Sequence, residues 1–135
     1  MISILFIDDC VSLMDITSRF LERSGNVIVD ISQTTEEARQ KMDYISYKVI
    51  IADYHQNEAA VMKLLHDVRE RGLMTPFIFF TVCQEEQIEE EAAKYDFVFF
   101  VPKLINFESN LPELEKVVLQ AGFDFSAPVA SCGQC

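Results

Sequence analysis

Residues 48–60 read KVIIADYHQNEAA, and this stretch bears on both the fold and the candidate site. Its first five residues form a nearly continuous apolar run, which is typical of a strand buried on both faces of a sheet. Asp53 ends the run, and the polar sequence YHQN follows it. A single aspartate at a strand end is usually a turn or capping residue. The rest of the chain decides whether Asp53 has a chemical role.

Four more short apolar runs resemble the one before Asp53. They span residues 2–7, 27–31, 77–81 and 97–101. Isoleucine, valine and phenylalanine are frequent in them, which indicates strands of a parallel sheet that is covered on both faces. The run at 27–31 carries Asp30 within it, so we expect this strand at an edge of the sheet.

The segments between these runs have the spacing of amphipathic helices. We expect helices over residues 11–24, 35–45, 58–71, 85–95 and 111–121. Thr34 and Glu37 form a capping box before the second of these helices, and Gly122 is expected to follow the end of the last one. Five alternations of strand and helix predict an α/β fold, a doubly wound (βα)5 unit with a parallel five-stranded sheet. Residues 122–135 are expected to be a C-terminal tail that is flexible at its end.

The composition restricts the class of protein. The chain has 135 residues and a formal net charge of -11, from 22 acidic and 11 basic side chains. One domain accounts for this length. The acid excess repels phosphate backbones and anionic lipid, so we expect neither nucleic acid nor a membrane surface as the primary partner. Magnesium, calcium or a basic patch on another protein fits this charge better.

The start of the chain and its cysteines indicate a soluble cytoplasmic protein. The stretch MISILFIDD lacks the charged beginning of a signal peptide and reaches two aspartates too soon. No apolar run approaches the roughly 18 residues of a membrane span. The four cysteines are therefore expected to be reduced thiols. Cys132 and Cys135 form a lone CxxC motif near the C-terminus, without the second pair of ligands that a zinc site normally needs.

The residues at the ends of the strands form a chemically consistent set. In an open α/β sheet, functional residues gather at the carboxyl ends of the strands. The first run ends at Asp8 and Asp9, the third at Asp53, the fourth at Thr81, and Lys103 follows the fifth. Clustered carboxylates raise one another's pKa, and a hard cation such as Mg²⁺ relieves their repulsion. An aspartate can attack phosphorus to form an acyl phosphate, with the metal ion and the lysine neutralising the transferring group. The joint pattern favours a chemical role for Asp53.

This set of residues resembles the receiver domain of two-component response regulators, over about residues 2–121. That family has an acidic pair after the first strand, a phospho-accepting aspartate after the third, a serine or threonine after the fourth and a lysine after the fifth. Asp53 lies 44 residues after Asp9, and Lys103 lies 22 residues after Thr81, which is close to the family's spacing. The resemblance implies a flavodoxin-like fold.

The resemblance also implies a reaction and a cofactor. A sensor histidine kinase would present a phosphohistidine, and Asp53 would accept the phosphoryl group. The cofactor would be Mg²⁺, held by Asp8, Asp9, Asp53 and the backbone carbonyl of His55. The chain would then be a phosphoacceptor and not an enzyme that turns over a small substrate.

A conformational response follows from the same resemblance. Thr81 and Lys103 would bind the phosphoryl oxygens, and Phe100 would be the switch aromatic residue that follows Thr81 inward. The face made by the fourth helix, fifth strand and fifth helix would bind an unidentified protein partner, and a second copy of the chain is a further candidate. Because no DNA-binding or enzymatic segment follows, we expect a stand-alone receiver.

Four positions near the expected site depart from the family pattern. Gln56 and Asn57 replace a Met-Pro pair, and Val82 replaces a small residue. The branched side chain of Val82 is expected to narrow the approach of the phosphodonor and to slow phosphotransfer. Leu104 stands where the family often has a proline behind a cis bond, so this loop either runs trans and offsets the preceding lysine, or keeps a cis bond that costs about 2.5–4 kcal/mol.

His55 and Cys83 flank the expected phosphate entrance. His55 could orient or block an attacking water molecule, but it could equally be an exposed loop residue without a role.

Two alternative functions remain open at this stage. A degenerate receiver would bind a protein partner without phosphorylation, which the altered loops permit. A phosphatase of the haloacid dehalogenase type also uses aspartate, threonine, lysine and Mg²⁺, but it places its nucleophile in a DxD motif after the first strand. Here Asp8 and Asp9 are followed by Cys10, so the sequence favours a receiver.

Overall fold

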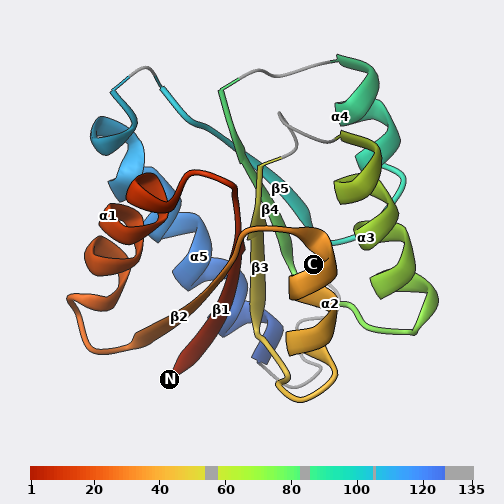
Figure 1. Cartoon of the computed structure of the whole chain (residues 1–135), viewed down its shortest axis with the longest axis horizontal. Coiled ribbons are helices and arrows are strands. Elements are labelled where there is room, and N and C mark those ends of the chain that lie inside the picture. The colour runs from red at the N-terminus through yellow and green to blue at the C-terminus, as the bar shows by residue number, and fades with distance from the viewer. Residues whose placement is uncertain (54–57, 83–85, 105, 127–135) are drawn as a thin grey trace.

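The computed structural model describes residues 1–53, 58–82, 86–104 and 106–126. Its strands are β1 (Ile2–Ile7), β2 (Val27–Ser32), β3 (Val49–Ala52), β4 (Phe77–Thr81) and β5 (Val98–Pro102). They form one parallel sheet in the order β2-β1-β3-β4-β5 (Figure 1). This order confirms the predicted doubly wound sheet, and it places β2 at an edge as Asp30 indicated.

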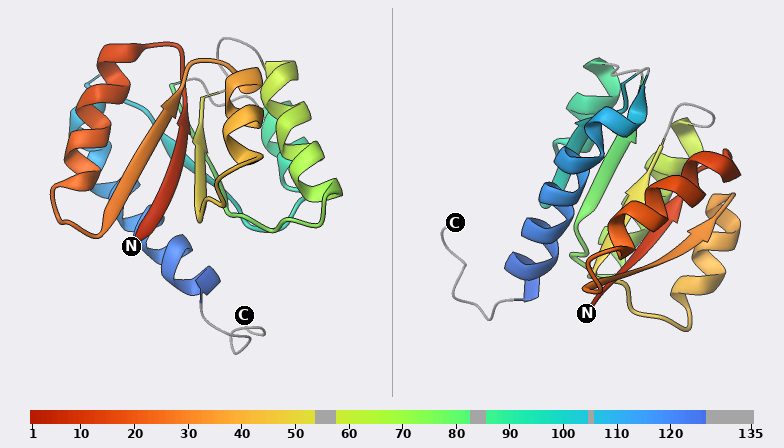
Figure 2. Two further views of the ribbon diagram at one scale, coloured as in Figure 1. Left: turned by 60° about the horizontal axis from the view of Figure 1, so that its bottom comes forward. Right: turned by 90° about the vertical axis from the view of Figure 1, so that its left-hand side faces the viewer.

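Helices cover both faces of this sheet. They are α1 (Val11–Glu22), α2 (Thr35–Met42), α3 (Glu58–Glu70), α4 (Glu86–Ala92) and α5 (Leu111–Ser126), with a short 3-10 helix, η1 (Phe107–Asn110), before α5. One face packs against α1 and α5, and the other against α2, α3 and α4 (Figure 2). Alternation along the strands divides the core accordingly: Phe80 lies on the α1 and α5 side, and Phe79 on the opposite side.

The start of α2 follows the predicted capping pattern only in part. The hydroxyl group of Thr34 accepts the backbone N–H of Glu37 at 3.1 Å, as a capping box requires. The carboxylate of Glu37 accepts the N–H of Gln33 at 2.8 Å, one residue before the N-cap. Together these bonds fix the loop between β2 and α2 beside the carboxyl end of β1.

The prediction that the last helix ends before Gly122 is wrong. The helix α5 continues to Ser126. A Cβ atom at Gly122 would lie 2.8 Å from Cδ1 of Ile2, so the glycine allows α5 to pack closely against the start of β1. Residues 122–126 of the expected tail therefore belong to this helix. The rest of that tail, with Cys132 and Cys135, lies outside the described residues.

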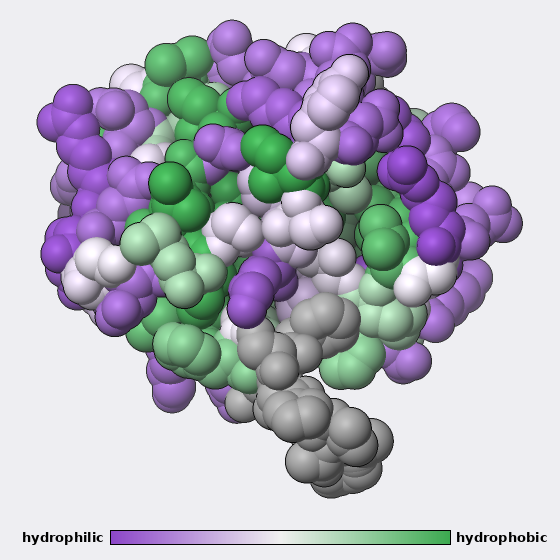
Figure 3. Space-filling model, turned by 90° about the horizontal axis from the view of Figure 1, so that it is seen from below, coloured by the Kyte–Doolittle hydropathy of each residue, from purple (hydrophilic) through white to green (hydrophobic). Residues whose placement is uncertain are grey.

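The amino end of the sheet is held by an arginine. Arg69, in the last turn of α3, donates to four backbone carbonyls from two loops. The acceptors are Leu73 at 3.0 Å, Thr75 at 2.9 Å, Asp96 at 2.8 Å and Phe97 at 3.3 Å. We call this group the Arg69 clamp. Apolar residues gather on the surface at this end of the molecule, with hydrophilic residues around them (Figure 3).

No helix in the described ranges is long and apolar enough to span a membrane.

Candidate functional site

The ends of three strands bring two carboxylates and an ammonium group together. Asp8 follows β1, Asp53 follows β3 and Lys103 follows β5. The Nζ atom of Lys103 lies 3.0 Å from Oδ2 of Asp8 and 2.6 Å from Oδ2 of Asp53. The sequence predicted this convergence, and the structure brings the three side chains into direct contact. We call them the Lys103 cluster.

Backbone hydrogen bonds at the ends of the strands set these positions. The N–H of Asp8 donates to the carbonyl of Ser32 at 3.1 Å, and the N–H of Asp53 donates to the carbonyl of Ile7 at 3.2 Å. The N–H of Lys103 donates to the carbonyl of Thr81 at 2.8 Å. Each of these three residues directly follows a strand, and its N–H group still bonds to a carbonyl of the neighbouring strand. The rigid sheet therefore positions the cluster.

The Lys103 cluster is largely removed from water. The exposed fractions of the side chains are 3% for Asp8, 6% for Lys103 and 9% for Asp53. The second carboxylate oxygen of Asp8, Oδ1, accepts the backbone N–H of Cys10 at 3.1 Å, just before α1 begins. At this depth the charges interact more strongly than they would at the surface.

The pKa shifts in the cluster follow from burial and from its excess negative charge. Burial raises the pKa of the Asp8 carboxyl group, and the Lys103 ammonium offsets only part of this effect. Burial by itself lowers the pKa of Lys103, but the hydrogen bond to Asp53 and the charge of Asp8 outweigh it, so the pKa of Lys103 is raised. Both groups therefore hold their protons more tightly than usual. Two carboxylates that share one ammonium group still favour an additional cation.

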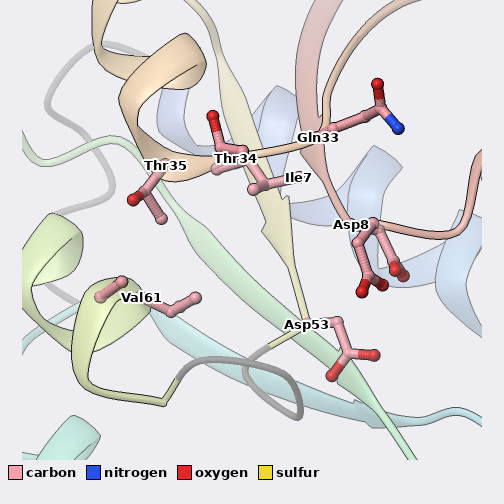
Figure 4. Close-up of a pocket in the computed structure, with 9 residues that line it drawn as sticks. Ile7, Asp8, Gln33, Thr34, Thr35, Asp53 and Val61 are labelled. Carbon is pink, nitrogen blue, oxygen red and sulfur yellow. The ribbon is translucent and has the colours of Figure 1, made fainter.

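A cavity of about 140 Å³ opens beside the two carboxylates (Figure 4). Its lining includes Asp8, Asp9 and Asp53, together with Gln33 and Thr34 of the loop after β2, Thr35 at the start of α2, and the α3 residues Ala60 and Val61. Oxygen ligands from two or three carboxylates, in a site open to water, suit Mg²⁺, which keeps several of its water ligands in proteins. Asp9 is exposed and reaches this cavity from the rim. These residues fit the expected metal ion.

Three more of the predicted residues, Thr81, Val82 and Phe100, lie in the described parts of the chain. Thr81 ends β4 and is 1% exposed, whereas Val82 is 57% exposed. Phe100 is half-buried on β5, and its ring stacks on Phe79 at 5.3 Å. His55 and Cys83 lie outside the described residues. Thr81 is therefore adjacent to Lys103, whose backbone N–H donates to its carbonyl, whereas Phe100 lies within β5.

Leu104 does not displace the lysine that precedes it. The sequence left open whether this loop runs trans with an offset lysine or keeps a cis bond. All peptide bonds of the described residues are trans, and Lys103 still reaches both carboxylates. The trans course is therefore correct, and the expected offset is absent.

The residues after β2 were not among those predicted to line the site. Gln33, Thr34 and Thr35 line the cavity because β2 lies next to β1, so the carboxyl end of β2 is adjacent to Asp8. Adding the end of the second strand to those of the other four would have found these residues. Asp30, inside that strand, does not line the cavity.

A second group of metal-binding residue types lies on the outer surface of α3. Ligand atoms of His66, Asp67 and Glu70 lie within 4.8 Å of one another. Asp67 already pairs with Arg39 at 2.7 Å, and this hydrogen bond lowers the pKa of its carboxyl group. These contacts are those of an ordinary surface ion-pair network, separate from the Lys103 cluster.

Comparisons with known proteins agree with this arrangement. The family model of the response regulator receiver domain matches residues 4–115. No curated protein matches the chain significantly. Among solved structures, the Francisella response regulator 1452 receiver domain is 19% identical, with a TM-score of 0.76, and the match covers 93% of this chain and 99% of that one.

Two further structures support the same fold. A response regulator receiver domain from Clostridium thermocellum is 18% identical, with a TM-score of 0.76, and covers 93% of this chain and 98% of its own. TrrA from Thermotoga maritima, solved in complex with Mg²⁺-BeF, is 20% identical, with a TM-score of 0.69 and coverage of 87% and 99%. With the strand order and the family match over most of its length, this chain belongs to the response regulator receiver family.

Proposed function

We propose that this chain is a phosphoacceptor that receives a phosphoryl group on Asp53 from a sensor histidine kinase. The observation that carries this proposal is the position of the Lys103 ammonium, between the carboxylates of Asp8 and Asp53. Two buried carboxylates beside one lysine would add little to folding stability, because the single positive charge leaves one negative charge without neutralisation. An acidic site with spare negative charge suits a metal ion and a transferring phosphoryl group together.

The residues of the chain have distinct roles in this reaction. A carboxylate oxygen of Asp53 attacks phosphorus as the P–N bond to the donor histidine breaks, and the freed imidazole nitrogen takes a proton. Lys103 moves its hydrogen bond from Asp53 to a phosphoryl oxygen, and the hydroxyl group of Thr81 donates to another.

A bound Mg²⁺ would supply positive charge opposite the phosphoryl oxygens. Asp8, Asp9, Asp53 and the backbone carbonyl of His55 would hold it.

The signal would leave the site through Thr81 and Phe100. Thr81 is buried at the end of β4, and Phe100 is half-buried on the neighbouring strand. The stacking of Phe100 on Phe79 links the outer strand to the core. A shift of Thr81 toward the phosphoryl group would open space for Phe100, and the surface of α4, β5 and α5 would change for a protein partner.

The test is chemical phosphorylation with acetyl phosphate and Mg²⁺, read by intact mass. We expect the wild type to gain one phosphoryl group, Asp53→Asn to gain none, and Asp15→Asn, which removes an exposed carboxylate on α1, to behave as the wild type. Beryllofluoride with Mg²⁺ should shift the NMR signals of Thr81 and Phe100 in the wild type only. If the wild type shows neither response, the chain is a receiver that binds its partner without phosphorylation.

Val82 is proposed to limit access to the site. Its side chain is exposed directly after Thr81 and is stiff because it branches at Cβ. We expect Val82→Ala to speed labelling by acetyl phosphate about threefold to tenfold, equivalent to roughly 1 kcal/mol of the activation barrier. Equal labelling and decay rates in the two proteins would reject this role.

A further inference from the structure

The outer edge of β2 carries backbone groups that no strand pairs with. Within the sheet, β2 has a neighbour on one side only, β1. The carbonyls of Asn26 and Ser32 accept hydrogen bonds from the N–H groups of Ile2, which begins β1, and Asp8, which follows it, so the even-numbered residues of β2 turn their backbone groups inward. The alternate residues then face away from the sheet. This places the backbone groups of Val27, Val29 and Ile31 on the open edge.

Two charged side chains cover this edge, one from each face of the sheet. Glu22, the last residue of α1, accepts the N–H of Val29 with Oε2 at 2.8 Å. Lys41, near the end of α2, donates from Nζ to the carbonyl of Ile31 at 2.5 Å. One outward donor and one outward acceptor are thus occupied by charge-assisted hydrogen bonds. An added strand would need these same two groups.

The edge would otherwise be well suited to pairing. The sequence of β2 is VIVDIS, rich in β-branched residues that favour strands. Ile28 is 50% exposed and Ile31 is 36% exposed. An extended edge with exposed apolar side chains is a template for another strand unless charge or cover prevents it. Glu22 and Lys41 provide that cover.

We propose that the β2 edge is a pairing surface for β2 of a second copy of this chain, kept closed by Glu22 and Lys41. A second copy fits because two antiparallel β2 strands related by a twofold axis present the same donors and acceptors to each other. In the register that pairs Val29 with Ile31 of the second copy, the two Asp30 side chains would lie directly opposite. Like charges at that position oppose pairing as well.

The test removes both covering groups without changing the net charge. The double variant Glu22→Ala, Lys41→Met loses one acid and one base, as does the control Glu70→Ala, Lys63→Met, whose residues are exposed on α3. Light scattering after size exclusion, over a concentration series, gives the dissociation constant of the dimer. We expect at least tenfold tighter association in the β2 double variant than in the wild type or the control.

A third substitution locates the association. Adding Ile31→Pro to the double variant removes the outward N–H of residue 31, which an edge strand tolerates. We expect this triple variant to return to the mass of the wild type at every concentration. A dimer that survives the proline forms elsewhere and overturns the proposal, as does a folded double variant with the same mass as its control.

Folding of the variants is checked by far-UV circular dichroism. If the double variant does not fold, Lys41→Met alone is expected to shift association in the same direction by a smaller factor, and no shift in that folded variant also rejects the proposal. Labelling of Asp53 by acetyl phosphate is measured on the same samples. Unchanged labelling with increased association separates this inference from the proposed phosphorylation, on which it does not depend.

Discussion

The two ends of the sheet are each held by one cation, the buried Lys103 and the half-buried Arg69, but the partners of these cations differ. At the carboxyl end, Lys103 contacts the carboxylates of Asp8 and Asp53. At the amino end, Arg69 contacts four backbone carbonyls, those of Leu73, Thr75, Asp96 and Phe97. Carboxylates can exchange a lysine for a metal ion or a proton, whereas carbonyl dipoles offer the same acceptors in every state of the protein.

This difference separates a site for chemistry from a structural clamp. The planar guanidinium of Arg69 directs several N–H groups at fixed angles, which suits carbonyls that come from two loops. The ammonium of Lys103 is a compact charge on a flexible stem, so it can move from one oxygen to another. We therefore expect changes at Lys103 to act mainly on phosphorylation, and changes at Arg69 to act mainly on stability.

The largest expected effect is on the rate of phosphorylation. Lys103→Met removes the positive charge beside Asp53, and we expect labelling by acetyl phosphate to slow by about a hundredfold or more. Arg69→Met lies at the opposite end of the sheet and should change the rate by less than about twofold, as for independent distant sites. Rates are compared by intact mass at a temperature where circular dichroism shows both variants folded. A comparable loss in Arg69→Met would mean that the two ends are coupled.

At the amino end of the sheet, the expected effect is on the free energy of unfolding and not on phosphorylation. Arg69→Met leaves four carbonyls without this donor, and we expect a loss of about 2–4 kcal/mol, measured by urea unfolding. Arg69→Lys should recover only part of this loss, because one ammonium group cannot reach acceptors in both loops. The matched control is Arg19→Met, which removes an exposed ion pair with Asp15 on α1 and should cost less than about 0.5 kcal/mol. Equal losses in Arg69→Met and Arg19→Met would show that the clamp has no structural role.

The Lys103 cluster could be predicted from sequence, and the Arg69 clamp could not. Parallel strands end at a common edge, so a list of the residues at those ends is enough to bring Asp8, Asp53 and Lys103 together. The acceptors of Arg69 are backbone carbonyls, which every residue type possesses. No residue pattern therefore distinguishes Arg69 from an exposed arginine at the end of an amphipathic helix.

The end of α5 is a second feature that could not be predicted from the sequence. A glycine after a helical segment usually marks the end of the helix, and this rule placed that end before Gly122. The structure uses the absence of a Cβ for close packing against Ile2 instead. This contact joins residues 120 positions apart, so local sequence patterns cannot reveal it. The cavity-lining residues after β2, by contrast, were not predicted only because the end of the second strand was left out of the set of strand ends.

Lys103 and Arg69 are expected to respond differently to alkaline pH, because only the lysine loses its proton in this range. The pKa of Lys103 in the folded protein lies above the value of 10.5 for an ordinary lysine. Its contribution to stability is therefore fully present below pH 10.5, and it is lost as the pH rises through the higher folded value, because the unfolded chain releases its proton first. Burial lowers the pKa of Arg69, but an arginine stays charged throughout this range.

Urea unfolding of the wild type, Lys103→Met and Arg69→Met between pH 9 and 11.5 tests this difference. The stability gap between the wild type and Lys103→Met should narrow above pH 10.5, while the gap between the wild type and Arg69→Met should stay constant. Other alkaline groups titrate in all three proteins and cancel in the differences. A gap between the wild type and Lys103→Met that stays constant up to pH 11.5 would mean that the pKa of Lys103 is not raised in the folded state.

The smallest expected effect concerns strain held by the Arg69 clamp. Phe97 has φ of 60°, a left-handed conformation that costs a residue with a Cβ about 1–2 kcal/mol, and its carbonyl accepts hydrogen bonds from both Arg69 and Phe77. Phe97→Gly should therefore raise the free energy of unfolding by up to about 1 kcal/mol, because relief of strain exceeds the entropy cost of glycine. Leu104→Gly is the matched control, since both side chains are 47% exposed and Leu104 has no positive φ. It should lower stability by roughly 0.5–1 kcal/mol. If Phe97→Gly destabilises as much as Leu104→Gly, the clamp holds no strained residue, and the amino end of the sheet is as relaxed as the carboxyl end.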